Sequence, residues 1–340
     1  MTQEGVRPLV SVCIANYNGE ALLRDCIASV MAQEGDFRVE IIVYDDASTD
    51  DSCALISRYF PDAQLMVGLQ NVGFCIANNR MVVQAKGEYV LLLNNDAELL
   101  PGALRALVTA ASEKAAGVLS LPQYDWRTGA LVDRGCLLDP TYCPVPYLDP
   151  KSRDVAYVIG ACLFMRRSLW VELGGFPEWM ESIGEDLYLC GRVRLRGLAV
   201  RVPDVSGYRH RQGASFGGNR MTEDGLLTTY RRRHLSERNR AWSLFLLTPT
   251  VLAYPWLGLY ILLLLVEGAA LSLLKRDARI WSRVYFRAAS ELLRNIGVMT
   301  RRRRRIQAER AISLRIYLRT FTPVLRKVQL VLHGGLPTLR

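Results

Sequence analysis

The sequence lacks the cysteine spacings that bind zinc or build a disulfide framework. None of its eight cysteines belongs to a C-x-x-C pair, and most of them lie inside apolar segments. Isolated thiols in this setting are typical of proteins from a reducing compartment. We therefore expect free thiols, with neither a cysteine-held zinc site nor a disulfide framework.

A secretory leader is also missing from the start of the sequence. Residues 1–5 contain no basic stretch that is followed by an apolar run. A leader peptide needs both features, so the sequence predicts that the first domain is cytoplasmic.

Acidic residues are scarce toward the C-terminus. Residues 275–340 contain 17 Lys and Arg but only three acids, Asp277, Glu291 and Glu309. The whole chain carries a net charge of +10, so this tail supplies the positive excess and the body is weakly acidic. Such a tail indicates an anionic partner, either a lipid surface or nucleic acid.

Short apolar strands alternate with helices of about a dozen residues. The expected strands cover residues 10–15, 39–44, 65–67, 89–93, 157–165 and 199–202. Ser48, with Asp51 three residues later, fits a capping box that would open the helix after the second strand. This alternation is typical of βαβ units, and it predicts an α/β fold with a mostly parallel central sheet flanked by helices.

Carboxylates stand where several of these elements begin or end. Asp45 and Asp46 follow the second strand, Asp96 follows the fourth, and Glu185 and Asp186 open a helix. The carboxyl ends of parallel strands meet at one edge of the sheet, where α/β proteins bind ligands. A carboxylate there suits a hard divalent cation. The alternative for each position is structural: a turn or helix cap at Asp96, and acids that favour a helix dipole at 185 and 186.

No G-x-G-x-x-G fingerprint follows the first strand. Asn-Tyr-Asn-Gly stands there instead, at residues 16–19, which argues against a dinucleotide site. Tyr17 offers a ring on which a base could stack, although simple packing is the alternative. The carboxylates of Asp45 and Asp46 could accept hydrogen bonds from a base or a ribose.

Eight segments follow one another over roughly residues 9 to 216 in an order that resembles a known family. They are Val10-Ser11-Val12 with Asn16-Tyr17-Asn18, Val43-Tyr44-Asp45-Asp46-Ala47-Ser48-Thr49-Asp50, Asn71-Val72-Gly73-Phe74 with Asn78-Asn79, Gly87-Glu88-Tyr89 leading into Leu93-Asn94-Asn95-Asp96, Gly160-Ala161, Gly174-Gly175-Phe176, Glu185-Asp186, and His210 with Gly213 and Ser215. This order resembles the inverting family 2 glycosyltransferases with a GT-A fold, especially the rhamnosyltransferase-like branch.

The resemblance implies a role for each matching residue. The base and ribose of a nucleotide-sugar would be bound by Ala15, Tyr17, Asp45 and Asp46, and the same nucleotide-sugar site would include Asn18, Asn71 and Asn95. Asp96 would hold Mg²⁺ or Mn²⁺ against the diphosphate, and His210 would complete the metal site. Asp186 would be the general base that deprotonates the acceptor hydroxyl, with Glu185 beside it.

The sequence departs from the family pattern at two positions. Asn94 stands where the first acid of a D-x-D motif is expected, and Tyr188 replaces the second acid after Glu185 and Asp186. These changes keep a second hypothesis open, a non-catalytic membrane scaffold with a glycosyltransferase-like fold. They leave metal binding to Asp96 and His210.

The C-terminal part has a different composition. Residues 242–274 contain a single charge, Glu267, and include Pro249 and Pro255. Arginines flank this segment on both sides, which disfavours a single membrane span. We expect a re-entrant or in-plane helical hairpin, and a buried core hairpin is the alternative.

The segments after this hairpin are rich in arginine. Residues 280–296 and 306–331 mix Arg with apolar residues on either side of the five-arginine run at 301–305. We expect basic amphipathic helices on an anionic membrane surface, and no nucleic acid. The chain would then comprise a GT-A domain over residues 1–230 and a basic, hydrophobic helical membrane-association region over residues 231–340.

Together these features lead to one functional expectation. The chain would be an inverting glycosyltransferase that moves rhamnose or a hexose from a nucleotide-diphospho-sugar to a hydroxyl of a lipid-linked or polysaccharide acceptor. It would act in cell-envelope glycan synthesis at the cytoplasmic face of the inner membrane.

Overall fold

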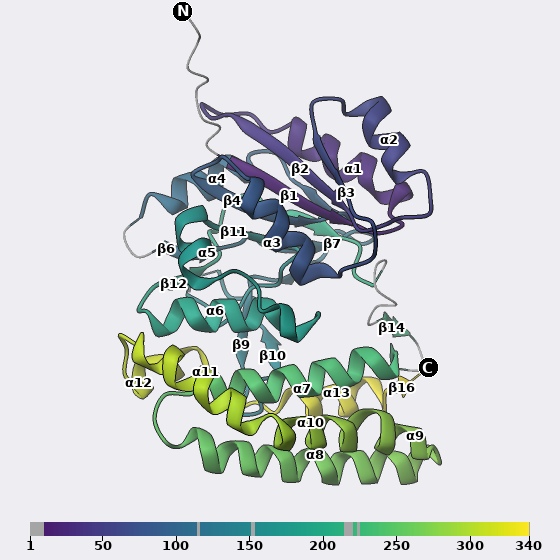
Figure 1. The fold of residues 1–340 in the computed structure, drawn as a ribbon, viewed down its shortest axis with the longest axis vertical. Helices are drawn as coiled ribbons and strands as arrows, with labels where there is room; N and C mark the ends of the chain where they lie inside the picture. Colours follow the sequence, from purple (N-terminus) through teal and green to yellow (C-terminus); the bar gives the residue numbers. More distant parts are fainter. Residues whose placement is uncertain (1–9, 114–115, 151–153, 214–219, 223–224, 340) are drawn as a thin grey trace, which may run out of the picture.

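A seven-stranded sheet forms the centre of the N-terminal half (Figure 1). The computed structural model describes residues 10–113, 116–150, 154–213, 220–222 and 225–339. The strand order is β12-β6-β11-β4-β1-β2-β3. The strands are β1 (Val10–Asn16), β2 (Val39–Asp45), β3 (Gln64–Val67), β4 (Tyr89–Asn94), β6 (Ala116–Leu119), β11 (Cys162–Arg166) and β12 (Ala199–Arg201). Only β11 runs antiparallel to its neighbours in this sheet, so the expected mostly parallel α/β sheet is confirmed.

Helices cover both faces of this sheet. One face packs against α1 (Glu20–Met31), α2 (Ser52–Tyr59) and α4 (Ala103–Ala111), and the other against α3 (Phe74–Gln84), α5 (Arg167–Leu173) and α6 (Glu185–Leu195). The central strand β4 contributes Leu91 and Leu93 to the first core and Val90 and Leu92 to the second. A strand that is buried on both faces has a continuous apolar sequence. β4 was predicted from this pattern.

A smaller four-stranded sheet lies beyond the carboxyl end of β4. Its order is β5-β13-β7-β8, formed by β5 (Ala97–Leu99), β13 (Tyr208–His210), β7 (Gln123–Asp125) and β8 (Leu131–Asp133). β13 pairs antiparallel with β5 so that His210 lies opposite Ala97. This register brings His210 next to Asp96, 114 residues away in the chain. The remaining strands are β9 (Cys136–Leu138), β10 (Pro144–Pro146), β14 (Arg220–Thr222), β15 (Gly225–Thr228) and β16 (Thr338–Leu339).

The predicted capping box at Ser48 is wrong. The helix begins at Ser52, and the Ser48 hydroxyl donates instead to the Asp45 carboxylate at 2.6 Å. Asp45, at the end of β2, therefore binds the Ser48 side chain that the sequence pattern assigned to a helix N-cap. All eight cysteines are free thiols, and all except Cys53 are buried.

The C-terminal region is a helical layer beneath the sheet (Figure 1). Its elements are α7 (Tyr230–Leu247), α8 (Ala253–Lys275), α9 (Ala278–Ile280), a π-helical turn (Trp281–Tyr285), α10 (Phe286–Arg294), α11 (Ile296–Ala308), α12 (Leu314–Tyr317), a short 3₁₀ turn (Leu318–Thr320) and α13 (Arg326–Gly334). A second short 3₁₀ turn, Glu178–Met180, lies between α5 and α6. α7 packs against α6, and one continuous hydrophobic core joins the sheet to this layer. The boundary expected at residue 230 therefore marks a change in composition and not a break in packing.

The hydrophobic segment at 242–274 forms two helices in different surroundings. Its first part is the end of α7, and residues 241–247 are buried within the protein. Pro249 lies in the link between the helices, and Pro255 lies in the first turn of α8, where proline is tolerated. Among the described residues, α8 is the one helix long and apolar enough to cross a membrane, and 28% of its most apolar stretch is buried. The first arm of the expected hairpin is thus core, and only α8 presents an apolar outer face.

The five-arginine run does not lie on a single surface. Arg303 is buried and donates hydrogen bonds to the carbonyl oxygens of Phe245, Leu246 and Thr250. These carbonyls stand at the C-terminal end of α7, where helix carbonyls lack partners. Arg303 is therefore one member of this run that does not point to a membrane surface. The amphipathic α10 likewise packs Ala288, Ala289 and Leu292 into the protein.

An ion network lies between α7, α8 and α13. Glu237 is fully buried and contacts Arg233 at 3.0 Å, Arg240 at 2.8 Å and Lys327 at 2.9 Å. Glu267, the single charge of residues 242–274, contacts Arg233 at 2.7 Å and Lys327 at 2.6 Å. Its carboxylate therefore faces the protein interior and leaves the outer face of α8 apolar.

Candidate active site

A cleft of about 880 Å³ runs along the carboxyl ends of β1 and β4. The N-terminal ends of α3, α6 and α7 form its other walls. Of the site residues predicted from the sequence, ten line the cleft: Ala15, Tyr17, Asn18, Asp46, Asn71, Asn95, Asp96, Glu185, Asp186 and His210. Asp45 is not part of the lining. Ser215, part of one quoted motif, lies outside the described residues.

One end of the cleft is built from the loops after β1 and β2. Tyr17 is 52% exposed there, so its ring is accessible to a ligand. The Asp46 carboxylate is buried and accepts hydrogen bonds from the backbone N–H groups of Val72 (2.6 Å) and Gly73 (2.8 Å). These bonds fix the loop that brings Asn71 and Phe74 to the cleft wall.

A chain of amide side chains links this end to the end of β4. Asn95 Nδ2 donates to Asn16 Oδ1 at 2.8 Å, and Asn16 Nδ2 donates to the Asp45 carboxylate at 2.9 Å. The carboxylate of Asp45 is buried behind this chain, and it also holds Ser48. A Cβ on Gly19 would lie 2.2 Å from both Asn16 Oδ1 and Asn95 Nδ2, so only glycine fits there. Asp45 therefore lies behind the cleft wall, where it positions Asn16 and Ser48, and it does not reach the surface of the cleft.

A carboxylate and an imidazole face each other beyond β4. His210 Nε2 lies 3.1 Å from Asp96 Oδ1, and both side chains are buried. The other ring nitrogen, His210 Nδ1, has no hydrogen-bond partner among the described residues. Carboxylate oxygens suit Mg²⁺ and Mn²⁺, and imidazole is a ligand of first-row transition metals. No group of three His, Cys, Asp or Glu side chains placed to hold a metal occurs in the described part of the chain. The pair therefore fits a cation whose remaining ligands come from a bound diphosphate and water.

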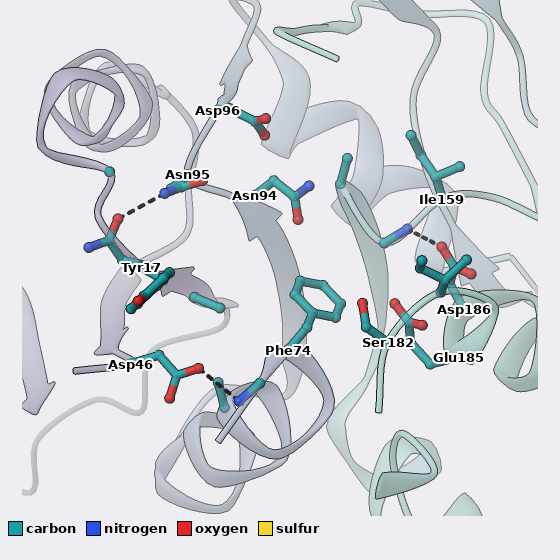
Figure 2. Close-up of a pocket in the computed structure, with 18 of the residues that line it drawn as sticks. Tyr17, Asp46, Phe74, Asn94, Asn95, Asp96, Ile159, Ser182, Glu185 and Asp186 are labelled. Atoms are coloured by element: carbon teal, nitrogen blue, oxygen red, sulfur yellow. Dashed lines mark hydrogen bonds between the residues drawn. The ribbon is translucent and has the colours of Figure 1, made fainter. Parts of the chain in front are cut away.

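The second acidic pair lies at the start of α6. Asp186 Oδ2 accepts hydrogen bonds from the Gly160 N–H at 2.9 Å and from the Tyr157 hydroxyl at 3.2 Å. Figure 2 places Tyr17 and Asp46 on one side of the cleft and Glu185 and Asp186 on the other, with Phe74 between them. Within the described residues, the buried Oε2 of Glu185 has no hydrogen-bond partner.

Burial changes the acidity of this pair. Desolvation raises the pKa of Asp186, and the hydrogen bonds from Gly160, Leu187 and Tyr157 oppose that rise because they favour the ionised carboxylate. Desolvation also raises the pKa of Glu185, and the negative charge of Asp186 raises it further, while the positive charge of Arg232 lowers it. Two buried acids with raised pKa values in an open cleft are typical of a catalytic site.

Comparison with known proteins identifies the family of this domain. Residues 11–173 match the model of the glycosyl transferase family 2. The chain carries a family 2 glycosyltransferase domain. It is also 28% identical over 205 residues to an N-acetylglucosaminyl-diphospho-decaprenol L-rhamnosyltransferase of Mycobacterium tuberculosis, which covers 51% of this chain and 67% of that protein.

Solved structures show that this glycosyltransferase has the GT-A fold. S. aureus TarS 1-349 in complex with UDP-GlcNAc matches with a TM-score of 0.56 at 18% identity, covering 88% of this chain and 90% of that one. The mannosyltransferase PcManGT of Pyrobaculum calidifontis, in complex with GDP-Man and Mn²⁺, matches with a TM-score of 0.50 at 18% identity, covering 85% and 87%. The expected fold and family are confirmed.

The glycosyltransferase cleft also contains residues that the sequence did not single out. Tyr157, Ile159 and Ser182 line it from the segments before β11 and α6, and Arg231 and Arg232 line it from the first turn of α7. The interruption of a strand-like segment by Gly160 and Ala161 was the one sequence signal for the first group. In the sequence, the two arginines looked like part of the basic stretch that precedes the hydrophobic segment at 242–274.

The departure at Tyr188 lies away from this surface. Tyr188 is buried and packs edge-on against Trp179, with ring centroids 6.0 Å apart, and it is not among the residues that line the cleft. Asn94, the other departure, does line the cleft. Of this motif, Glu185 and Asp186 line the cleft, and Tyr188 does not.

Proposed function

We propose that this enzyme transfers rhamnose or a hexose, with inversion, from a nucleotide-diphospho-sugar to a hydroxyl of a lipid-linked or polysaccharide acceptor. The single observation that carries the proposal is the arrangement of two acidic sites across one cleft. Asp96 and His210 lie at one wall, and Asp186 lies at the other with its carboxylate oriented by Gly160 and Tyr157. Inversion needs a base on the face of the anomeric carbon opposite the leaving group.

The donor nucleotide would bind at the Tyr17 end. Tyr17 offers its exposed ring to the base, and the buried Asp46 accepts ribose or base hydrogen bonds as well as those of its own loop. Asn18, Asn71, Asn95 and the backbone at Ala15 line the path toward the diphosphate. We no longer assign Asp45 direct contact with the nucleotide, because its carboxylate holds Asn16 and Ser48 behind the wall.

Asp96 and His210 would hold Mg²⁺ or Mn²⁺ together with the donor diphosphate. A divalent cation bound there would neutralise the negative charge that develops on the departing diphosphate. The solved structure of PcManGT with GDP-Man and Mn²⁺ supports this assignment by fold.

Asp186 would act as the general base. Its carboxylate accepts the proton of the acceptor hydroxyl while the hydroxyl oxygen forms a bond to the anomeric carbon. The bond from that carbon to the diphosphate oxygen breaks on the opposite face. Burial supports this role, because a desolvated carboxylate with a raised pKa is a stronger base.

The outer face of α8 supports attachment to an anionic membrane. Leu259, Leu262, Leu263, Val266 and Leu274 are all between 48% and 66% exposed. Lys275 and Arg276 follow at the end of the helix. An apolar face bordered by cations suits an in-plane helix on anionic lipid. We place the enzyme at the cytoplasmic face of the inner membrane in cell-envelope glycan synthesis, and the decaprenol-linked acceptor in the name of the mycobacterial relative supports this.

The variant Asp186→Asn tests the proposal. It should lower transfer by about 10²–10⁴-fold, as expected when a general base is lost. The melting temperature of the variant should still rise with a nucleotide-sugar and Mn²⁺, because donor binding is separate from the base. A variant that binds donor and turns over at a near-normal rate would exclude Asp186 as the base.

A further inference from the structure

The first turn of α7 lies in the active-site cleft although it follows the family 2 match. Arg231 and Arg232 line the cleft next to Ser182 and Glu185. Figure 2 places Ser182 and Glu185 across the cleft from Tyr17 and Asp46. α7 is 18 residues long and begins at Tyr230, after Thr229, whose hydroxyl caps it by accepting from the Arg232 N–H at 3.1 Å. A helix of this length presents partial positive charge at its first turn. The first turn of α7 therefore brings positive charge to this end of the cleft, and Arg231 there also lies 3.3 Å from the carboxylate of Glu181.

Two polar groups at this end are buried and unsatisfied. Among the described residues, neither Glu185 Oε2 nor Arg232 Nε has a hydrogen-bond partner. Glu185 is only 5% exposed and lines the cleft. The positive charge of Arg232 lowers the pKa of Glu185, although no ion pair joins the two in the described part of the chain. Buried polar groups are nearly always paired, and a ligand that brings both a hydroxyl and an anion would supply partners for these two atoms.

The same turn contacts the segment that follows the C-terminal end of α8. The Tyr230 hydroxyl donates to the Asp277 carboxylate, in the turn between α8 and α9. The guanidinium groups of Arg279 and Arg283 lie 5.6 and 6.0 Å from the centre of the Tyr230 ring. A row of cations thus connects the C-terminal end of α8 to the cleft. A lipid whose chain rests on α8 would meet these cations at the level of its head group.

We propose that the first turn of α7 is the subsite for the diphosphate of a lipid-linked acceptor, bound by Arg231 and Arg232 next to Glu185. The inference rests on the proposed function and specifies that the acceptor is lipid-linked. Glu185 accepts a hydroxyl of the acceptor sugar, and the sugar is joined directly to the diphosphate that the arginines hold. The donor diphosphate lies elsewhere, beside Asp96 and His210, so the cleft has two separate anion sites. A polysaccharide acceptor without a phosphate would bring no anion to the two arginines.

Binding of farnesyl diphosphate, with farnesol as the matched probe without phosphate, tests this subsite. Titration calorimetry is done on the full chain in detergent. Arg231→Gln and Arg232→Gln should each weaken farnesyl diphosphate binding at least tenfold, which is the usual effect of losing one charge-assisted hydrogen bond. Farnesol binding should not change. Arg105→Gln, at an exposed arginine of α4, is the matched control and should bind the diphosphate as the parent does.

Two further measurements separate the outcomes. Asp96→Asn should leave farnesyl diphosphate binding intact; if it weakens binding as much as Arg232→Gln does, the probe occupies the donor site and the inference is wrong. Equal affinity of Arg231→Gln and the parent protein would also overturn it, and because Arg231 is exposed that variant carries little risk of misfolding. Melting temperatures with UDP or dTDP and Mn²⁺ report on the donor site alone. Donor stabilisation without arginine-dependent probe binding would therefore refute the subsite and leave the proposed transferase function standing.

Discussion

Asn239 Nδ2 donates a hydrogen bond of 2.8 Å to the carbonyl oxygen of Ile183, two residues before the acidic pair of the cleft. The same amide group also lies 2.9 Å from the Met180 carbonyl oxygen and 3.0 Å from that of Ser182. In the same loop, Glu181 (φ 67°), Ile183 (φ 69°) and Gly184 (φ 96°) adopt left-handed backbone conformations. Such conformations are costly for residues other than glycine and persist only where surrounding structure holds them. A fully buried side chain of α7 therefore holds the loop that orients Asp186.

Asn239→Ala should reduce turnover more than donor affinity. The change leaves buried carbonyl groups without a donor, which costs about 1–3 kcal/mol of stability and frees the strained loop. We expect kcat to fall at least tenfold, while the nucleotide-sugar still raises the melting temperature. Steady-state kinetics and thermal melts measure the two effects. Asn295→Ala, which removes an exposed helix-end amide, is the control, and equal kcat values for both variants would contradict a positioning role for Asn239.

Tyr157→Phe should move the acid limb of the pH profile upward. Burial raises the pKa of Asp186, so kcat/KM should rise with pH along a limb that lies above the ordinary carboxyl range. The Tyr157 hydroxyl stabilises the ionised carboxylate and lowers that pKa. Its removal should raise the pKa and shift the limb to higher pH by about one unit, the effect of one hydrogen bond to a charged group. Tyr59→Phe, at an exposed tyrosine of α2, should leave the profile in place. A downward shift in Tyr157→Phe would show that another group controls the limb.

His210→Ala should weaken the dependence of the enzyme on its cation. With Asp96 as the only remaining protein ligand, a higher Mn²⁺ concentration should be needed for half-maximal transfer, by roughly tenfold or more. The measurement is a Mn²⁺ titration of transfer after treatment with EDTA. Parent enzyme that keeps full activity in EDTA would remove the metal role assigned to Asp96 and His210.

Glu237→Gln should destabilise the whole fold. Glu237 is fully buried among Arg233, Arg240 and Lys327, so its neutralisation leaves buried positive charges without a counter-ion. Removing one partner of a buried ion network costs about 3–5 kcal/mol. The three cations hold the pKa of Glu237 far below its usual range. Its contribution to stability is therefore present at neutral pH and is lost only in strong acid. Urea unfolding compares this variant with Asp62→Asn, at an exposed carboxylate, and equal midpoints would contradict the prediction.

Leu262→Glu combined with Val266→Glu should release the protein from membranes. Both side chains are more than half exposed on the outer face of α8. Each would otherwise contribute about 1.5–3 kcal/mol when fully buried in lipid. We expect sedimentation with vesicles that contain anionic phosphatidylglycerol to fall sharply. Val205→Glu, at a similarly exposed valine outside this face, is the control. Unchanged sedimentation of the double variant would exclude α8 as the attachment surface.

The strands and the sheet edge could be predicted from the sequence because their signals are local. The apolar run of β4 ends at Asn94, and the structure places the cleft at that point. The pairing of His210 with Asp96 could not be read from local pattern, because it depends on the register between β13 and β5, and only the family resemblance suggested it. Contacts between residues far apart in the chain leave no periodic pattern in the sequence.

Three side-chain positions could not be predicted from the sequence for a shared physical reason, which is that tertiary contacts decide where these side chains point. Ser48 bonds to Asp45 instead of capping a helix. Arg303 enters the interior to bind the end of α7, while the run of arginines around it looked uniformly suited to lipid. Arg232 faces the cleft and not a bilayer. A run of like residues does not reveal which member points inward, since that depends on the helix face and its neighbours.

The shared use of α7 has a practical consequence for preparing this enzyme. Cutting the chain at residue 230 to obtain a detergent-free catalytic fragment would remove Asn239 and both cleft arginines along with the hydrophobic helix, and would uncover the apolar surface of α6. Such a fragment should aggregate or be inactive. A soluble and active version should instead keep every helix and carry polar substitutions on the outer face of α8 alone.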